Sequence, residues 1–469
     1  MIKLFTFKPA WFLIVFFIMF SFRVNAQSIY FQKTFDTLGC YNANDIITYF
    51  DNSYYVCGSS YTSNANDAVV LHLDSSGNLI WINTYSTVFL DGAMNVAISS
   101  DSNLIVAGVM NLQTAEDSKL WLSKITPSGA TLWSYTYQIC GASQPFDLIT
   151  LKNGGFALTG ECVTPGNSSD VMLIKFNDFG QIIWTKIFNY FPGDVAKSLA
   201  ELDNGYFIVA GGTGRNGIVS AYVIKTDSYG DTLWTKTYGN NGFEFFESVK
   251  VASDSFLVFT GYSYDTIQNN YNVYLVKTDL EGNLIWEKFI GNNYENTGAD
   301  LIIQGGEYFI AGTTNSTQRY EFLLIKTDSL GDTIWTHEFG GPGSQVLSSF
   351  SSTDDRGFIM AGYDGLNGQK ILVIKTDSIG TTIQNIENTE SIQPLNFYPN
   401  PASNKITISN LPLNSKIEII SAIGESISIY QNPNDEISID TSNLPSGTYY
   451  FKVLIDNYFY CKPFIVIHL

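Results

Sequence analysis

Seven polar residues recur at intervals of 49 to 53 along the chain, and four of them carry carboxylates. They are Asp45, Asn95, Asp147, Ser198, Glu247, Asp300 and Ser349. Oxygen ligands of this kind suit hard cations, so calcium or a polyol could bind where they meet. Two of the carboxylates could also act as acid and base on a glycosidic bond. The opposing interpretation is that these residues cap turns that lead into strands.

Other residues with reactive chemistry are sparse. His72, His337 and His468 lie far apart in the chain, so neither a Ser-His-Asp triad nor a histidine-rich zinc site is expected. His72 takes a position that is lysine in six other repeats, and we expect this position on a solvated face or as a snorkelling side chain. The glycine-rich run 211–217 is not followed by a helical pattern, so it predicts a loop rather than a phosphate cradle. We assign no catalytic residue, and calcium is the one metal considered.

A tryptophan repeat defines the elements that must position these residues. Six tryptophans are spaced 49 to 52 residues apart, each four residues after a glycine: Trp81, Trp133, Trp184, Trp234, Trp286 and Trp335. A period near fifty is typical of a repeat architecture. In the fourth repeat, β-rich runs at 198–202, 206–211, 221–225 and 233–238 are separated by turn residues, which predicts a four-stranded antiparallel sheet. One such sheet per repeat is a propeller blade, and its first strand would bring the polar residues to a central channel.

The ends of the repeat array indicate how the ring closes. The second-strand signature occurs seven times, whereas only six copies are followed by a tryptophan strand. Residues 29–35 match that strand and place Phe31 fifty residues before Trp81. An open ring would leave two exposed sheet edges. We therefore predict an all-β fold, a seven-bladed β-propeller over residues 27–384, closed by residues 29–35 in the blade of residues 342–379.

Three repeats combine an acidic residue, a glycine turn and a tryptophan: Asp227, Gly230 and Trp234; Asp279, Gly282 and Trp286; and Asp328, Gly331 and Trp335. This phrase resembles the blades of quinoprotein-type propellers over residues 28 to about 384. The resemblance implies that these residues dock neighbouring blades. Quinoprotein enzymes add a catalytic carboxylate, a bound calcium and a vicinal cysteine pair, and this sequence has no adjacent cysteines.

Charge and the N-terminal segment indicate where the protein works. The formal net charge is −19, and such an acidic surface repels nucleic acid and anionic lipid. Residues 1–26 combine Lys3 and Lys8, an apolar stretch at 10–22 and Val24-Asn25-Ala26, the pattern of a signal peptide. No other stretch is apolar for the length of a membrane span.

Cysteines exported to an oxidising compartment can pair. Cys40 and Cys57 are 17 residues apart, and Cys140 and Cys162 are 22 apart. Local disulfides Cys40–Cys57 and Cys140–Cys162 are candidates, with buried free thiols as the alternative. Cys461 is left without a partner in this scheme.

Composition changes at the end of the repeats. Residues 385–394 are polar and predict a linker, whereas 395–469 alternate apolar residues with Pro and Gly, which predicts a small β-sandwich. Three motifs follow one another there: Tyr398-Pro399-Asn400-Pro401; Ile419-Ile420-Ser421 with Gly424; and Leu444-Pro445-Ser446-Gly447-Thr448-Tyr449.

These motifs resemble the type A sorting domain of the bacterial type IX secretion system. The final residues 464–469 depart from the basic ending usual in that family. The resemblance implies recognition by the type IX machinery, export across the outer membrane, and release or attachment at the cell surface.

Two functions remain open at this point. The first is a secreted or cell-surface propeller that serves as a binding or adhesion module for a glycan or a protein, without covalent chemistry. The alternative is an extracellular polysaccharide-active hydrolase or lyase that uses carboxylates such as Asp147, Glu247 and Asp300 at the channel mouth. Propellers host both classes of function, so the fold alone does not decide between them.

Overall fold

The computed structural model describes residues 30–468 with short gaps. The gaps are 63–64, 88–89, 113–117, 165–167, 192, 216–217, 240–241, 254, 292–293, 383–395, 412–414, 422–425, 433, 435 and 456–457. The predicted signal peptide, the predicted linker and Gly424 therefore lie outside the described residues.

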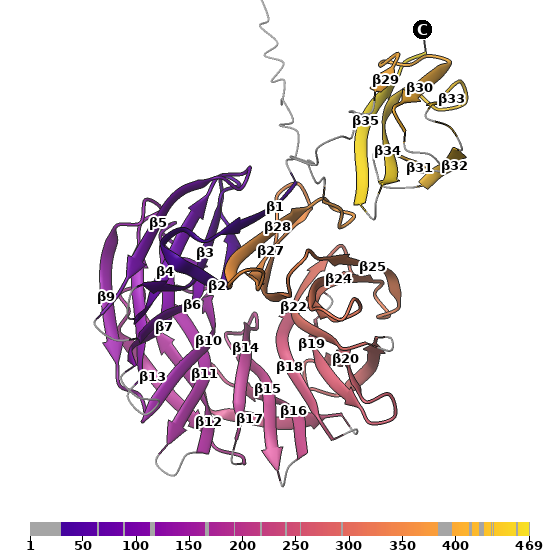
Figure 1. Cartoon of the computed structure of the whole chain (residues 1–469). Coiled ribbons are helices and arrows are strands. Elements are labelled where there is room, and N and C mark those ends of the chain that lie inside the picture. The colour runs from indigo at the N-terminus through magenta and orange to yellow at the C-terminus, as the bar shows by residue number, and fades with distance from the viewer. Residues whose placement is uncertain are drawn as a thin grey trace, which may run out of the picture.

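The larger domain is a β-propeller (Figure 1). Its described residues form seven four-stranded antiparallel sheets, which we call blades 1 to 7. Blade 1 consists of β2 (Cys40–Thr48), β3 (Tyr54–Thr62), β4 (Ala65–Leu73) and β5 (Leu79–Tyr85). Blade 2 consists of β6 (Leu90–Ile98), β7 (Leu104–Leu112), β8 (Lys119–Ile125) and β9 (Thr131–Tyr137). Blade 3 consists of β10 (Ala142–Thr150), β11 (Phe156–Thr164), β12 (Ser168–Phe176) and β13 (Ile182–Phe188). Blade 4 consists of β14 (Val195–Glu201), β15 (Phe207–Arg215), β16 (Ile218–Thr226) and β17 (Thr232–Tyr238). Blade 5 consists of β18 (Glu244–Val251), β19 (Phe256–Asp265), β20 (Asn270–Asp279) and β21 (Leu284–Ile290). Blade 6 consists of β22 (Asn296–Gln304), β23 (Glu307–Thr314), β24 (Glu321–Thr327) and β25 (Thr333–Phe339). Blade 7 consists of β26 (Gln345–Ser352), β27 (Phe358–Asp364), β28 (Lys370–Thr376) and β1 (Phe31–Phe35).

The hydrophobic core lies between the blades. One cluster joins Ile208 and Val223 of blade 4 to Phe246, Phe259 and Tyr274 of blade 5. The second and third strands of each blade are buried on both faces, which explains why they read as continuous apolar runs rather than alternating ones. The first strands contact one another in sequence around the ring, including β26 with β2, and so surround its centre.

The N-terminal strand closes the ring as predicted. Strand β1 pairs antiparallel with β28 and completes blade 7. Phe31 stands opposite Lys375, as Trp234 stands opposite Lys225 in blade 4. Phe31, in the position that tryptophan fills elsewhere, is only 6% exposed and packs in a core cluster with residues of blades 1 and 7.

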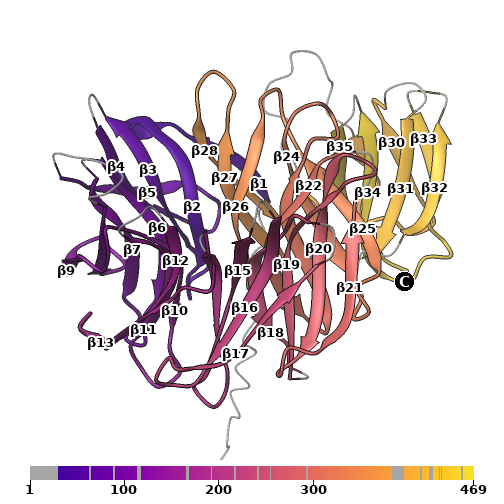
Figure 2. The same cartoon turned by 90° about the horizontal axis from the view of Figure 1, so that it is seen from below.

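The C-terminal region forms two small sheets over one core, as the predicted sandwich requires (Figure 2). The first sheet has the order β29 (Asn396–Tyr398), β30 (Lys405–Ser409), β33 (Glu436–Asp440). The second has the order β32 (Ser426–Asn432), β31 (Ser415–Ser421), β34 (Gly447–Ile455), β35 (Tyr458–Val466). Phe451 and Phe464 stack at 4.2 Å in the core between them.

The cysteines pair only in part as predicted. Cys140 and Cys162 form a disulfide, whereas Cys40 and Cys57 are free and buried. The predicted Cys40–Cys57 bridge is wrong because Cys40 stands opposite Ser60 and Cys57 opposite Asp45, with two register shifts between these pairs. A search of the described residues for an apolar helix of membrane-spanning length finds none.

Candidate functional site

The predicted polar residues occupy one equivalent position in the first strands of the blades. Each first strand has a β-bulge, and the equivalent position is the residue directly after it. Bulges re-aim side chains, and here they turn the next residue toward the neighbouring blade. A glycine on the second strand permits the bulge: a Cβ on Gly211 would lie 2.0 Å from the backbone oxygen of Val195.

Blade 5 departs from the sequence prediction. Its bulge falls between Phe246 and Ser248, so Ser248 takes the equivalent position and Glu247 lies within the bulge. The described set is therefore Asp45, Asn95, Asp147, Ser198, Ser248, Asp300 and Ser349, which we call the polar belt. Ser248 was missed because the bulge cannot be placed to one residue from the pattern alone.

Hydrogen bonds of the polar belt join one blade to the next. Asp45 accepts a bond of 2.6 Å from the Ser349 hydroxyl of blade 7 and another of 2.9 Å from the Val96 amide of blade 2. Asn95 donates to the Phe146 carbonyl of blade 3 at 2.9 Å. The belt thus links blades 7, 1, 2 and 3.

The same pattern continues around the ring. Asp147 accepts bonds from the Leu199 amide at 2.7 Å and from the Ser198 hydroxyl at 3.1 Å. Ser198 in turn accepts from the Val249 amide at 3.1 Å, and Ser248 donates to Asp300 at 2.8 Å. These contacts link blades 3 to 6. These residues lie within strands and bond to a neighbouring blade, so their contacts are not those of residues that cap turns.

The belt carboxylates face a common electrostatic environment. Burial raises the pKa of Asp45 to about 6; the charges of Asp147 and Asp300 add to this rise, and the hydrogen bonds from Ser349 and Val96 oppose it. Burial also raises the pKa of Asp147, against the nearby charge of Lys250. The structure thus brings Asp45, Asp147 and Asp300 together.

Lys250 is a central residue that the sequence reading missed. Its ammonium lies 3.3 Å from the Asp300 carboxylate. Burial favours the neutral amine and would lower the pKa of Lys250. The negative charges of Asp300, Asp147 and Asp45 outweigh this effect, so the pKa of Lys250 is raised. The available signal was a lysine two residues after Ser248 in a first strand, where blades 1 and 3 have Ile47 and Ile149.

Glu247 does not join these aspartates through a shared contact. Burial raises its pKa, and the charge of Lys197 opposes the rise. Lys197 itself lies 3.7 Å from the Phe146 ring centroid. Within the part of the chain that the structure describes, no cluster of three or more His, Cys, Asp or Glu side chains is arranged to hold a metal.

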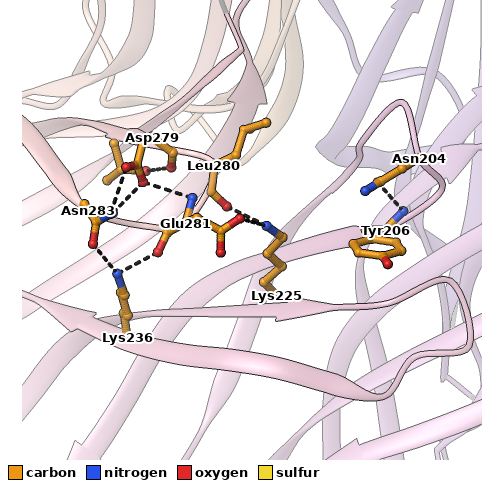
Figure 3. A network of polar contacts seen from close by, with 9 residues as sticks. Asn204, Tyr206, Lys225, Lys236, Asp279, Leu280, Glu281 and Asn283 are labelled. Atoms are coloured by element: carbon orange, nitrogen blue, oxygen red, sulfur yellow. Dashed lines mark hydrogen bonds and ion pairs between the residues drawn. The ribbon is translucent and has the colours of Figure 1, made fainter.

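The junction between blades 4 and 5 has a second network of polar contacts at the turn before β21 (Figure 3). Lys236 donates to the Glu281 carbonyl at 2.6 Å and to Asn283 at 3.0 Å. Lys225 donates to the Leu280 carbonyl and the Glu281 carboxylate, both at 2.8 Å. Trp234 packs into the core cluster that joins the two blades.

The lysine position buries the lysine stems, while the ammonium groups reach more exposed carboxylates, as at a snorkelling position. Lys124, Lys225, Lys277 and Lys375 are all buried, and Lys124 and Lys375 form ion pairs with Asp101 and Asp355. His72, at the same position in blade 1, stacks on Tyr55 at 4.3 Å between ring centroids. Burial lowers the pKa of His72, with Asp51 and Asp74 opposing. These contacts give the position a structural role within its own blade, and Lys225 also bonds to the next blade.

The C-terminal motifs meet around the last strand. Asn400 accepts a bond of 2.9 Å from the Ile465 amide, and Ala402 exchanges backbone bonds with Ile465 and Ile467. The Tyr449 hydroxyl donates to the Pro445 carbonyl at 2.8 Å, while Gly447 opens β34. The first motif thus bonds to one end of β35, and the third motif pairs with the same end, with Tyr449 opposite Phe464.

Residues 396–467 match the family described as the secretion system C-terminal sorting domain. The C-terminal domain is a sorting domain. The protein is accordingly an exported one, secreted or placed on the cell surface through the type IX secretion system. The sorting domain covers a minor part of the chain and says nothing of what the propeller does.

Comparisons of the whole chain add similarity of shape only. A search of the curated proteins finds no match. PorZ, a surface component of the type IX secretion system of Porphyromonas gingivalis, is 13% identical, with 89% of this chain and 68% of that chain covered and a TM-score of 0.32. Sqt1 from Chaetomium thermophilum is 13% identical over 73% of this chain and 98% of that chain, with a TM-score of 0.47. An acylaminoacyl peptidase from Pyrococcus horikoshii is 10% identical over 79% of this chain and 58% of that chain, with a TM-score of 0.43. Matches this distant carry no argument about function.

Proposed function

We propose that the propeller is a binding or adhesion module for an extracellular glycan or protein, delivered by the sorting domain. In this proposal the tryptophan repeat of quinoprotein type docks seven blades and supplies a rigid support rather than a catalytic centre. The observation that carries the proposal is the polar belt, whose carboxylates are engaged in hydrogen bonds between blades. Such carboxylates stabilise the ring and are poorly placed to exchange protons with a substrate.

The alternative is a hydrolase or lyase, and one observation favours it. Asp45 has a pKa raised to about 6, a value that suits a general acid. Yet Asp45 accepts bonds from Ser349, Val96 and its neighbour Ile46, so a proton cycle at this residue would disturb two blade junctions. We therefore place the alternative second.

Calcium is not required by the proposed function. Lys250 lies among Asp45, Asp147 and Asp300 and supplies positive charge at the place where a cation would otherwise balance them. A divalent ion would have to compete with this ammonium for the same oxygen atoms.

The test uses the full exported chain on a glycan array and in pull-downs from the extracellular medium. Specific retention of a glycan or a defined protein, without turnover, is expected. Release of reducing or unsaturated ends from a polysaccharide, abolished by Asp147→Asn, would replace the binding proposal with the enzyme alternative. Absence of glycan, protein and turnover signals would reject both.

A further inference from the structure

A cleft of about 570 Å³ opens at the outer rim between blades 4 and 5. It lies away from the polar belt, and its size is in the range of ligand pockets. Its lining comes from three segments: Tyr190 after β13, the edge strand β17 with Tyr222 behind it, and the start of β21 with its preceding turn.

Two stacked tyrosines form one wall of the cleft. The rings of Tyr190 and Tyr222 lie 5.5 Å apart with an interplanar angle of 15°. Tyr222 is 3% exposed and fixed in the core, whereas Tyr190 is 50% exposed. The Tyr190 amide donates to Asp194 at 2.7 Å, which holds the segment that carries the ring. The exposed ring is therefore positioned before any ligand arrives.

Polar groups form another part of the lining. Lys236 is held by the Glu281 carbonyl and by Asn283 (Figure 3). Glu287 accepts a bond of 2.6 Å from Tyr274 through one carboxylate oxygen, Oε2. An ammonium, an amide and a carboxylate thus meet the same space as an exposed aromatic ring. Each is oriented by the blades rather than by the ligand.

We propose that this cleft binds a carbohydrate, as a segment of two or three sugar units within a glycan. The inference rests on the proposed binding function and names its site and ligand class. The apolar face of a pyranose ring can stack on Tyr190, while its hydroxyls bond to Lys236, Asn283 and Glu287. A lipophilic ligand would remove water from these polar groups without offering them hydrogen bonds of its own, at a cost in affinity. An added peptide strand, held mainly by main-chain bonds to an edge strand, is the competing occupant.

The experiment measures binding of defined di- and trisaccharides of glucose, mannose, galactose and N-acetylglucosamine to the full chain by calorimetry. Tyr190→Ala is expected to weaken binding of the best saccharide at least tenfold, whereas Tyr190→Phe, which keeps the ring, should stay within about threefold. Tyr229→Ala is the matched control, because Tyr229 is a 71% exposed tyrosine of blade 4 outside the cleft lining. Thermal unfolding of all three variants shows whether the fold is kept.

Three results are informative in different ways. Loss of affinity in Tyr190→Ala but not in Tyr229→Ala supports the site. Undiminished saccharide binding by a folded Tyr190→Ala overturns the site but leaves the proposed function in place. If no saccharide binds, the carbohydrate inference is rejected, and capture of a defined protein or peptide partner would then preserve the broader binding function alone.

Discussion

The hydroxyl of Ser349 donates a hydrogen bond of 2.6 Å to Oδ1 of Asp45, a residue 304 positions earlier in the chain. This bond joins the last blade to the first at the inner edge of the ring. Strand β1 joins the same ends within the sheet of blade 7. The ring is therefore closed twice, once by a strand and once by the polar belt.

Replacing Phe31 should weaken the pairing of β1 that closes the ring. Phe31→Ala removes a buried ring from the core cluster shared by β1 and blade 1, so we expect a loss of about 3 to 5 kcal/mol in the free energy of unfolding. Denaturant unfolding followed by tryptophan fluorescence measures this loss. Thr34→Ala changes an exposed residue on the same strand and should change the free energy of unfolding by less than about 0.5 kcal/mol. Equal effects of the two changes would argue against closure by packing.

Gly282 should be needed for blade docking as well as for its turn. Its φ is +72°, and an added Cβ would lie 2.8 Å from the Trp234 ring of blade 4. We expect Gly282→Ala to cost about 1 kcal/mol for the left-handed backbone and a further 1 to 3 kcal/mol for overlap with the indole. Gly305→Ala isolates the first effect, because Gly305 has φ +62° and open space around it. Comparable unfolding midpoints for the two variants would contradict the docking role.

Asp45 should make stability depend on pH. Its folded pKa of about 6 exceeds the ordinary 3.8, so between these values the folded protein keeps a proton that the unfolded chain releases. The free energy of unfolding should therefore fall as pH rises from about 4 to about 6. In Asp45→Asn this fall should shrink by the order of 2 kcal/mol, with Asp147 and Glu247 supplying the remainder.

Denaturant unfolding at several pH values between 3 and 8 checks this effect. Asp203→Asn is the control, because the hydrogen bond from Lys152 lowers the Asp203 pKa and confines its influence to lower pH. A pH slope in Asp45→Asn identical to that of the unaltered protein would show that Asp45 is not the group responsible.

The cysteines should separate into two classes in alkylation. At pH 8 the native protein should leave Cys40 and Cys57 unmodified, because burial raises the pKa of Cys40 to about 11 and that of Cys57 well above its usual range. Both should react once guanidinium unfolds the chain, whereas Cys140 and Cys162 should react only after reduction. Peptide mass mapping reads each site. A peptide linking Cys40 to Cys57 would contradict the observed pairing.

Several features of the fold were predictable because they depend on local pattern. The fifty-residue period, the apolar second and third strands and the turn glycines repeat in every blade, so each copy reinforces the others. Phe31 marked the closing strand because it stands one period before Trp81, and pairing of β1 with β28 confirms it. The sorting motifs likewise indicated a C-terminal domain that the family comparison shows.

The site was less predictable, because its contacts join residues from different blades. A shift of one residue at the blade 5 bulge exchanges Glu247 for Ser248, and two shifts in blade 1 keep Cys40 from Cys57. The cleft brings Tyr190 against Tyr222 and both near Glu287. Sequence alone determined the repeat, the closing strand and the sorting domain, since each is written as a local or periodic pattern. Only the tertiary structure decided that the belt carboxylates bond across blades and that a cleft opens on the rim, because bulges and long-range packing set where those side chains point.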